Sequence, residues 1–340
     1  MKRLTRNIER QWYSRPDWLL LLLPLSFLFR VIAFFRRRHQ SAGAPAAELP
    51  VVVVGNIMLG GTGKTPVIIA LCRALVDRGI RPVVISRGYG VHSDQSRVLP
   101  PGGTAEQFGD EPVLISRATG CAVVVGADRV ASVRLVAERQ LGDLVLSDDG
   151  LQHYRLSRHY EIAVLDARRR LGNGWCLPVG PLREPASRLL EVDAVLINGA
   201  PFYAPWLPKG KTYSMRLQPS HWRNLLSGQS LPVRDLDLTS ATAVAGIGNP
   251  ERFFQTLRDL GFAGPAHAFP DHHPFSPGDL QGLSASLLLM TEKDAVKVQS
   301  FAESDWWALV VEAELPPALV QTVALLAAPG SDKTSSELDL

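Results

Sequence analysis

The sequence predicts an α/β fold in which a mostly parallel β-sheet carries helices on both faces and a smaller α/β domain follows. From residue 49 onward, short and nearly continuous apolar runs alternate with stretches of helical periodicity. Such runs are expected for strands buried on both faces, and their alternation with helices favours a parallel sheet. The composition, 46% hydrophobic and 20% charged over 340 residues, leaves room for two domains and excludes disordered and fibrous classes.

Residues 1–45 form a basic and apolar arm. Residues 18–35 are apolar except at two positions, aromatic residues precede them, and three consecutive arginines follow. Residues 1–39 contain nine Lys or Arg against two acidic residues, so this part carries +7 and the rest of the chain −4. Aromatic and basic flanks around an apolar helix are typical of segments at the headgroup level of a bilayer. We therefore expect the arm to meet an anionic membrane surface, with the body in the cytoplasm and no nucleic-acid partner.

The arm has three other interpretations: a signal peptide, a full membrane span and a buried core helix. A cleaved signal peptide is disfavoured because the charged block at 36–39 separates the apolar run from the small residues after it. The apolar run is a little short for a full membrane span and contains Pro24 and Arg30, so the helix would dip into the bilayer or span it weakly. A buried core helix with a basic cap is the remaining alternative, because shorter apolar runs also suit a protein core.

The first domain is expected at residues 46–205. Its helices are predicted at 65–78, with Pro66 in the first turn and Gly79 just beyond the end, and at 127–141. Its strands are predicted at 50–54, 82–85, 122–125, 144–146, 162–165 and 194–197.

The region that follows, 201–237, contains Trp and Pro and is predicted to be irregular, and 206–239 is interpreted as a linker. The smaller domain is expected at 240–329, with a helix at 251–260 introduced by Asn249 and Pro250. Residues 330–340 are polar and are predicted to be disordered. The strands of the smaller domain are predicted at 241–245, 266–269, 287–290 and 309–311.

The chain has three cysteines, far apart in sequence. Cys72, Cys121 and Cys176 form no C-x-x-C pair. This pattern indicates a reducing compartment and no metal cluster.

A glycine-rich stretch links the first predicted strand to the first predicted helix, which makes the domain P-loop NTPase-like. The segment 54–69, VGNIMLGGTGKTPVII, turns through Gly60, Gly61, Thr62 and Gly63 and opens a helix at Lys64 and Thr65. Three glycines with φ > 0 would aim N–H groups at an anion, and the helix dipole would add positive potential. Lys64 would reach the β- and γ-phosphates and Thr65 would bind Mg²⁺. Met58 stands where the usual pattern has its first glycine, so the alternative is a chance Gly-Lys-Thr in a tight turn.

Acidic residues follow another predicted strand. The segment DLVLSDDGLQH places Asp148 and Asp149 at the carboxyl end of a buried run. P-loop enzymes hold Mg²⁺ through a second acid at this place, because open sheets form their sites beyond the carboxyl ends of the strands. The alternative is an ordinary Asp-Asp-Gly turn.

Three more motifs offer groups for proton transfer and phosphate binding. FGDEP at 108–112 contains Asp110 and Glu111, and FPDHHPF at 269–275 contains Asp271, His272 and His273. Phosphoryl transfer to a hydroxyl requires a carboxylate near that hydroxyl, sometimes tuned by a histidine. A zinc site at Asp-His-His lacks a partner motif with helical His spacing. GPLREP at 180–185 adds Arg183 and Glu184, which suit phosphate or metal-shell contacts and equally a structural ion pair.

Eight motifs in this order resemble one family. They are GNIMLGGTGKTP, SRGYG at 86–90, GDEP, DDGLQH, GPLREP, GIGNPERFF at 246–254, DHHPF and TEKDAVK at 291–297. Together they resemble the tetraacyldisaccharide 4′-kinases, the lipid A 4′-kinases of Gram-negative bacteria. The loop of that family starts at the equivalent of Gly55 and Asn56, and a residue other than glycine at Met58 fits it.

The resemblance implies an enzyme on the cytoplasmic face of the inner membrane that uses ATP and Mg²⁺. It would transfer the γ-phosphate to the 4′-hydroxyl of tetraacyldisaccharide 1-phosphate, a membrane-embedded glycolipid, and so form lipid IVA. Asp110 would be the general base with His272 as its partner, although His273 remains open for that role. Lys64 and Thr65 would bind phosphates and Mg²⁺, and Arg183 would lie near the phosphates or the lipid headgroup. Asp148, Asp149 and Glu184 would arrange Mg²⁺ and its waters, and no protein partner is implied.

Two other classes of function compete with the kinase. A membrane switch ATPase of the partition or septum-placement type also combines a GGTGKT loop with membrane attachment, but such proteins resemble one another in a lysine where this chain has Leu59. A membrane-anchored adaptor without catalysis would leave Lys64 replaceable. Phosphate transfer that depends on the lipid acceptor would separate the kinase from both.

Overall fold

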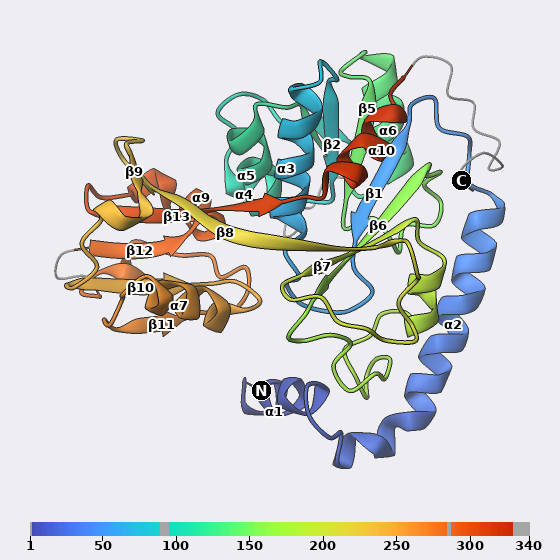
Figure 1. Ribbon diagram of the computed structural model, residues 1–340, viewed down its shortest axis with the longest axis horizontal. Helices are drawn as coiled ribbons and strands as arrows, with labels where there is room; N and C mark the ends of the chain where they lie inside the picture. The colour runs from blue at the N-terminus through green and yellow to red at the C-terminus, as the bar shows by residue number, and fades with distance from the viewer. Residues whose placement is uncertain (1, 89–94, 284–286, 329–340) are drawn as a thin grey trace.

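Two α/β lobes and an N-terminal arm make up the computed structural model, which describes residues 2–88, 95–283 and 287–328 (Figure 1). Among these residues a single path of hydrogen-bonded neighbours runs through a 13-stranded sheet, in the order β11-β10-β12-β13-β8-β7-β6-β1-β5-β2-β4-β3, with β9 paired to β8. Two sequence predictions lie outside the described residues: Tyr89 and Gly90 of the SRGYG motif, and the tail 330–340.

The larger lobe confirms the predicted parallel sheet. All neighbouring strand pairs from β4 to the first part of β8 are parallel, and the edge strand β3 is antiparallel to β4. Every residue of β1, β2, β4, β5 and β7 is buried, which explains their uninterrupted apolar sequences. The strands are β1 (Val51–Gly55), β2 (Pro82–Ser86), β3 (Arg97–Val98), β4 (Val123–Val125), β5 (Leu144–Asp148), β6 (Tyr160–Asp166) and β7 (Ala194–Asn198).

Helices cover both faces of this sheet, as predicted. Val52 and Val54 of β1 belong to the apolar cluster beneath α3 and α5, whereas Val51 and Val53 belong to the opposite cluster beneath α6. Alternate residues of a strand point to opposite faces, so one five-residue strand contributes to both cores. The helices of this lobe are α3 (Lys64–Val76), α4 (Ala105–Phe108), α5 (Asp110–Thr119), α6 (Arg129–Glu138) and the 3₁₀ turn η2 (Ala186–Leu190).

The smaller lobe lies beside the larger one and continues the same sheet (Figure 1). Its strands are parallel from β11 to β13, and β13 then runs antiparallel to β8. The strands are β8 (Thr212–Asn224), β9 (Ser230–Pro232), β10 (Ala241–Ala245), β11 (Ala266–Ala268), β12 (Leu287–Thr291) and β13 (Trp306–Glu314). The helices are η3 (Val233–Asp235), α7 (Pro250–Asp259), α8 (Pro277–Leu280), α9 (Glu292–Val298) and η4 (Gln299–Phe301).

The structure differs from the sequence prediction in the segment that connects the two lobes and in the last helix. The region predicted to be irregular contains β8, whose first four residues pair with β7 and whose remainder pairs with β13. It lacks an apolar run because β8 crosses between the lobes and buries only Met215, Trp222 and Asn224. The last helix, α10 (Pro317–Leu325), returns to the larger lobe, where its apolar side chains join the core of α3. Residues 317–325, expected in the smaller domain, therefore belong to the core of the larger lobe.

The arm consists of α1 (Lys2–Trp12), η1 (Trp18–Leu22) and the long helix α2 (Leu23–Ala42), which stands at the side of the larger lobe (Figure 1). The segment Trp18–Ala42 has a mean hydropathy of 2.2 and the length to cross a membrane, and only 11% of its most apolar window is buried. The buried-core interpretation is therefore wrong. The arm is docked by a few polar contacts: Ser26 Oγ donates to the Cys176 carbonyl at 2.8 Å and Trp12 Nε1 to the Pro178 carbonyl at 3.1 Å.

Candidate active site

The loop between β1 and α3 has the geometry of an anion-binding turn. Gly60 and Gly63 have φ of 99° and 98°, and Gly63 precedes the first residue of α3, Lys64. The N–H groups of this turn and the N-terminus of α3 therefore face the same space. Gly61, expected to share the left-handed conformation, lies outside it. Its backbone N instead lies against the smaller lobe, where a Cβ added to Gly248 would come within 3.2 Å of it.

Met58 explains why the usual glycine pattern fails in this loop. Its side chain is completely buried, its backbone forms a β-bridge with Leu182, and the adjacent Leu59 N–H donates to the Pro181 carbonyl at 2.9 Å. The close approach that requires glycine occurs at Gly55, where a Cβ would lie 2.8 Å from Cγ of Leu151. The loop therefore begins at Gly55 and continues through the buried Asn56, whose amide donates to the Gly60 carbonyl at 3.2 Å.

Lys64, Asp149 and Arg183 form one charged group beside the loop. Lys64 Nζ lies 3.4 Å from Asp149 Oδ1, and Arg183 Nη1 donates to Asp149 Oδ2 at 3.0 Å. Burial alone would raise the pKa of Asp149, but the two cations together hold that pKa well below its ordinary value. Asp149 has φ of 48°, so the chain turns at once after β5 and sends the two adjacent aspartates in different directions. Asp149 is thus a fixed anion that holds both cations at the loop.

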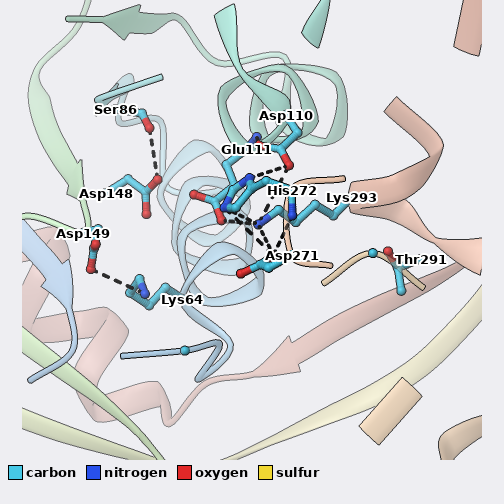
Figure 2. Close-up of polar contacts among 12 residues, drawn as sticks. Lys64, Ser86, Asp110, Glu111, Asp148, Asp149, Asp271, His272, Thr291 and Lys293 are labelled. Carbon is cyan, nitrogen blue, oxygen red and sulfur yellow. Dashed lines mark hydrogen bonds and ion pairs between the residues drawn. The ribbon is translucent and has the colours of Figure 1, made fainter. Parts of the chain in front are cut away.

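Asp148 has a different environment at the end of β5. It pairs in register with Val54 of β1 and accepts a hydrogen bond from Ser86 Oγ at 3.1 Å through Oδ2, while its Oδ1 is buried without a hydrogen-bond partner (Figure 2). Burial, followed by the nearby charges of Glu111 and Asp149, raises the pKa of Asp148 to about 7. An unpaired buried carboxylate oxygen of this kind requires a proton or a cation.

The structure brings Asp110 and His272 together from different lobes. Asp110 is the first residue of α5 and is almost fully buried, and its Oδ2 lies 3.0 Å from Nδ1 of His272 (Figure 2). His272 has φ of 56°, in the turn that follows β11, and this unusual conformation points its ring at the larger lobe. Burial would raise the pKa of Asp110, but the hydrogen bond to His272 and the charge of Lys293 hold it below its ordinary value.

His273, the alternative partner, lies elsewhere. Its ring packs between Phe269 and Phe275, with centroid distances of 4.9 Å to each, and its Nε2 lies 3.4 Å from Asp279. These contacts anchor the loop that carries His272. The structure therefore favours His272 as the neighbour of Asp110.

Glu184 does not present a free carboxylate. Gln152 donates to its Oε1 at 2.6 Å, the Tyr154 hydroxyl donates to Oε2, and Arg188 Nε lies 3.5 Å from Oε2. The same Gln152 accepts from Arg183 at 3.1 Å and donates to the Asn56 carbonyl at 3.0 Å. These contacts place Glu184 behind the site, where it orients Arg183 and the loop through Gln152. Oε1 accepts only the Gln152 bond among these contacts, so it keeps a lone pair for a metal-bound water.

A polar chain that the sequence did not predict joins the smaller lobe to the phosphate loop. Arg252 of α7 donates to Asp166 Oδ2 at 3.0 Å and to Asn198 Oδ1 at 2.8 Å. Asn198, at the end of β7, donates in turn to the Thr62 carbonyl at 3.0 Å. The GIGNPERFF motif contains Arg252, and the position of Asn198 after an apolar strand was a second signal for a residue at the site edge.

Comparison with known proteins points to one family. Residues 18–327 match the family model described as Tetraacyldisaccharide-1-P 4′-kinase. The chain is 48% identical over 316 residues to the tetraacyldisaccharide 4′-kinase of Pseudomonas aeruginosa, covering 91% of this chain and 93% of that protein. It is 42% identical over 324 residues to the protein of the same name from Methylobacillus flagellatus, covering 94% and 95% of the two chains.

A solved structure is similar over nearly the whole fold. The crystal structure of LpxK from Aquifex aeolicus in complex with ATP has a TM-score of 0.77 and 27% sequence identity, covering 91% of this chain and 99% of that one. The resemblance inferred from the eight motifs is therefore confirmed. The chain belongs to the tetraacyldisaccharide-1-P 4′-kinase family.

Proposed function

We propose that this chain transfers the γ-phosphate of ATP to the 4′-hydroxyl of tetraacyldisaccharide 1-phosphate, forming lipid IVA at the cytoplasmic face of the inner membrane. The observation that carries the proposal is a cavity of about 1080 Å³ between α2 and the loops of the larger lobe. One wall consists of residues 27 and 29–37 of the apolar helix, and the opposite wall includes Asp149, Arg183 and Glu184. A single hollow thus extends from the apolar helix to Asp149 and Arg183, and Asp149 forms an ion pair with Lys64 of the phosphate loop.

The charge of this cavity suits an anionic lipid headgroup. Arginines from several segments line it: Arg30, Arg36, Arg37, Arg87, Arg129, Arg155 and Arg183. Arg129 is 3% exposed, and although its Nη2 donates to the Asp148 carbonyl at 2.8 Å, its Nε and Nη1 are buried without partners. Burial lowers the pKa of Arg129 to about 10, so it still carries its charge at neutral pH. A buried guanidinium with two unused donors is a ready site for a phosphate group.

The exposed apolar side chains of η1 and α2 suit attachment to a bilayer. Leu21 of η1 and Phe27 and Phe35 of α2 are 81%, 67% and 62% exposed, and none of them is needed to fill the protein core. An apolar face of this kind with basic residues at its end is stabilised at a lipid headgroup layer. The cavity then opens beside the membrane, so the substrate headgroup reaches Asp149 and Arg183 while its acyl chains remain in lipid.

The roles of the site residues follow from their contacts. Lys64 and the N–H groups of the loop at 60–65 bind the phosphates of ATP, and Arg183 adds positive charge on the side of the cavity. Asp110 accepts the proton of the acceptor hydroxyl, and His272, hydrogen-bonded to it, orients the carboxylate. The two lobes contribute one member each, so closure of the lobes assembles the base and excludes water.

A divalent cation fits the residues at the end of β5. Among the described residues no group of three or more His, Cys, Asp or Glu could hold a metal alone, which is the usual situation for Mg²⁺ bound together with nucleotide phosphates. The unpaired buried Oδ1 of Asp148 and the hydroxyl of Thr65 in the first turn of α3 would hold Mg²⁺, with Asp149 nearby. When bound, the cation would neutralise charge on the phosphates.

An acceptor-dependent transfer assay tests the proposal. The full chain in mild detergent is incubated with Mg-ATP and tetraacyldisaccharide 1-phosphate, and the lipid is analysed by mass spectrometry beside Lys64→Ala and Asp110→Ala. We expect a lipid heavier by one phosphate that both variants fail to make. Arg258→Met, on the exposed face of α7, is the matched control and keeps the activity. ATP hydrolysis that is independent of the lipid, with no phosphorylated product, would support the switch ATPase instead.

A further inference from the structure

Lys293 lies at the centre of the Asp110–His272 pair, although the sequence assigned it no role. It is the second residue of α9, in the smaller lobe. Its Nζ lies 2.9 Å from Glu111 Oε1 and 3.3 Å from His272 Nε2 (Figure 2). Two further carboxylates surround it, Asp271 at 3.7 Å and Asp110 at 3.9 Å. The lysine therefore contacts both members of the pair and both lobes.

The charge state of Lys293 follows from its neighbours. Burial would lower its pKa, but the three carboxylates outweigh this effect and hold the pKa above its ordinary value. Lys293 is thus an ammonium, which has three N–H donors and no lone pair. At 3.3 Å from His272 Nε2 it can only donate, so Nε2 is the acceptor and carries no proton.

This contact decides the tautomer of His272. A neutral imidazole has one donor and one acceptor nitrogen, so with Nε2 accepting, the ring proton lies on Nδ1. Nδ1 then donates to Asp110 Oδ2 at 3.0 Å, which requires that oxygen to be ionised. Asp271 Oδ1 lies 3.9 Å from Nε2, beyond hydrogen-bonding distance, and does not offer Nε2–H an alternative partner.

We propose that Lys293 is a positioning residue for phosphoryl transfer: its ammonium donates to Nε2 of His272, which places the ring proton on Nδ1 and keeps Asp110 ionised as the base. The inference rests on the proposed function, because it gives Lys293 a part in the same reaction. The lysine acts through His272 and Asp110 and needs no contact with substrate.

The surrounding structure holds the lysine in place from both lobes. Thr291 caps α9 by accepting from the Asp294 N–H, and the completely buried Asp294 accepts from the Gly246 N–H at 3.0 Å and from Lys297 at 2.7 Å. On the side of the larger lobe, Glu111 in the first turn of α5 forms the shortest contact with Lys293. The Lys293–Glu111 ion pair thus links α9 to α5 at the point where His272 meets Asp110.

The pH dependence of transfer tests this role with substitutions of opposite sign. The charged groups that face Asp110 and His272 are Glu111 on α5, Asp271 before α8, and Lys293 and Lys297 on α9. Lys293→Met removes a cation, so the acid limb of kcat/KM should move to higher pH by about one unit, the lower end of what a nearby opposite charge contributes. Glu111→Gln removes an anion and should move the limb to lower pH or leave it in place.

Two results separate positioning from a merely structural ion pair. Both substitutions break the Lys293–Glu111 pair, so a structural role predicts the same loss at every pH and the same drop in Tm for both variants. Lys293→Arg retains charge and N–H donors and should restore the position of the acid limb. Parallel loss in Lys293→Met and Glu111→Gln, with unshifted profiles, would overturn the inference.

Imidazole ¹⁵N NMR reports the tautomer of His272 in protein without substrate. In histidine-labelled protein we expect an unprotonated Nε2 and a protonated Nδ1 for His272, assigned by the signals that His272→Gln removes. Lys293→Met removes the donor to Nε2, so the share of ring proton on Nε2 should rise in this variant. If the wild-type ring carries its proton on Nε2, the inference is wrong even if the enzyme phosphorylates the lipid. If the NMR result holds but no lipid product forms, the proposed function fails by itself.

Discussion

Replacing Arg252 with methionine should loosen the connection between the smaller lobe and the phosphate loop. Arg252 connects α7 to the polar chain Asp166–Asn198–Thr62 through hydrogen bonds of 3.0 Å to Asp166 and 2.8 Å to Asn198. Both acceptors are buried, at 4% and 2% exposure, so water does not readily replace the guanidinium. Methionine preserves the apolar stem and removes only the donors.

The size of the effect follows from these two bonds. The guanidinium is a cation, so both bonds are charge-assisted; because the Arg252 side chain is 34% exposed, each contributes about 1.5 kcal/mol, or about 3 kcal/mol in total. Asp166 Oδ1 still accepts from the N–H groups of Arg168 and Arg169 at 2.9 and 3.0 Å, which prevents a larger loss. For a chain of this length the entropy of unfolding is about 0.7 kcal/mol/K, so Tm should fall by about 4 °C.

The assay combines thermal unfolding in detergent with transfer kinetics. We expect the lower Tm together with a higher KM for ATP and an unchanged KM for the lipid, because Asn198 positions the Thr62 carbonyl of the phosphate loop. Arg258→Met is the matched control on the same helix, since its ion pair with Glu251 is exposed and such pairs contribute at most about 1 kcal/mol. If Arg252→Met and Arg258→Met lower Tm equally and leave KM for ATP unchanged, the reasoning about this chain is refuted.

Four further predictions follow from the same structure. Because the pKa of Asp148 is raised from 3.8 to about 7, the folded protein retains a proton that the unfolded chain releases, and the stability that this group contributes falls as pH rises between these values. Mg²⁺ competes with that proton, so Mg²⁺ should raise Tm more at pH 8 than at pH 6. Asp148→Asn should abolish this difference. Arg129→Met should raise KM for the lipid by about tenfold, and Arg134→Met, on the exposed side of α6, should not, as measured by initial rates against lipid concentration. Met58→Gly, which restores the usual glycine pattern, should lower the free energy of unfolding by about 3 kcal/mol without lowering KM for ATP, because it empties a buried site. Combined Leu21→Ser, Leu25→Ser and Leu28→Ser, on the exposed face outside the cavity, should reduce transfer in bilayers more than in detergent micelles, and equal loss in both would contradict membrane contact by this face.

Much of the fold could be predicted from the sequence because its signals are local. The strands of the larger lobe are buried on both faces, so each is an apolar run, and α3 has a proline in its first turn and a glycine after its end. β8 lacked such a signal, because it lies between the lobes with few buried side chains and pairs with β13 about ninety residues later. The packing of α10 on the larger lobe likewise depends on which surface remains open after the sheet has formed.

Some residues of the candidate site could likewise be predicted from local motifs, whereas others depend on the fold. The glycine-rich turn with Lys64 is one contiguous stretch and the acidic pair at the end of β5 is another, so each motif indicates a phosphate site without the fold. The preference for His272 over His273 depends on the backbone at φ 56°, and the part of Lys293 depends on α9 reaching Asp110 and Glu111 from another lobe. Glu184 also belongs here, because only its contacts with Gln152, Tyr154 and Arg188 show that its carboxylate is already engaged.

The sequence by itself determined the α/β class, the phosphate loop with its displaced first glycine, the apolar basic arm and the family, because each depends on neighbouring residues or on motifs in fixed order. Only the tertiary structure decided which histidine meets Asp110, that the buried Oδ1 of Asp148 has no hydrogen-bond partner, and that the cavity beneath α2 reaches Asp149 and Arg183. The physical reason is that hydrogen-bond partners, burial and charge states arise from residues brought together across more than a hundred positions of chain, as Asp110 and His272 are. Periodicity and local propensity carry no information about such distances.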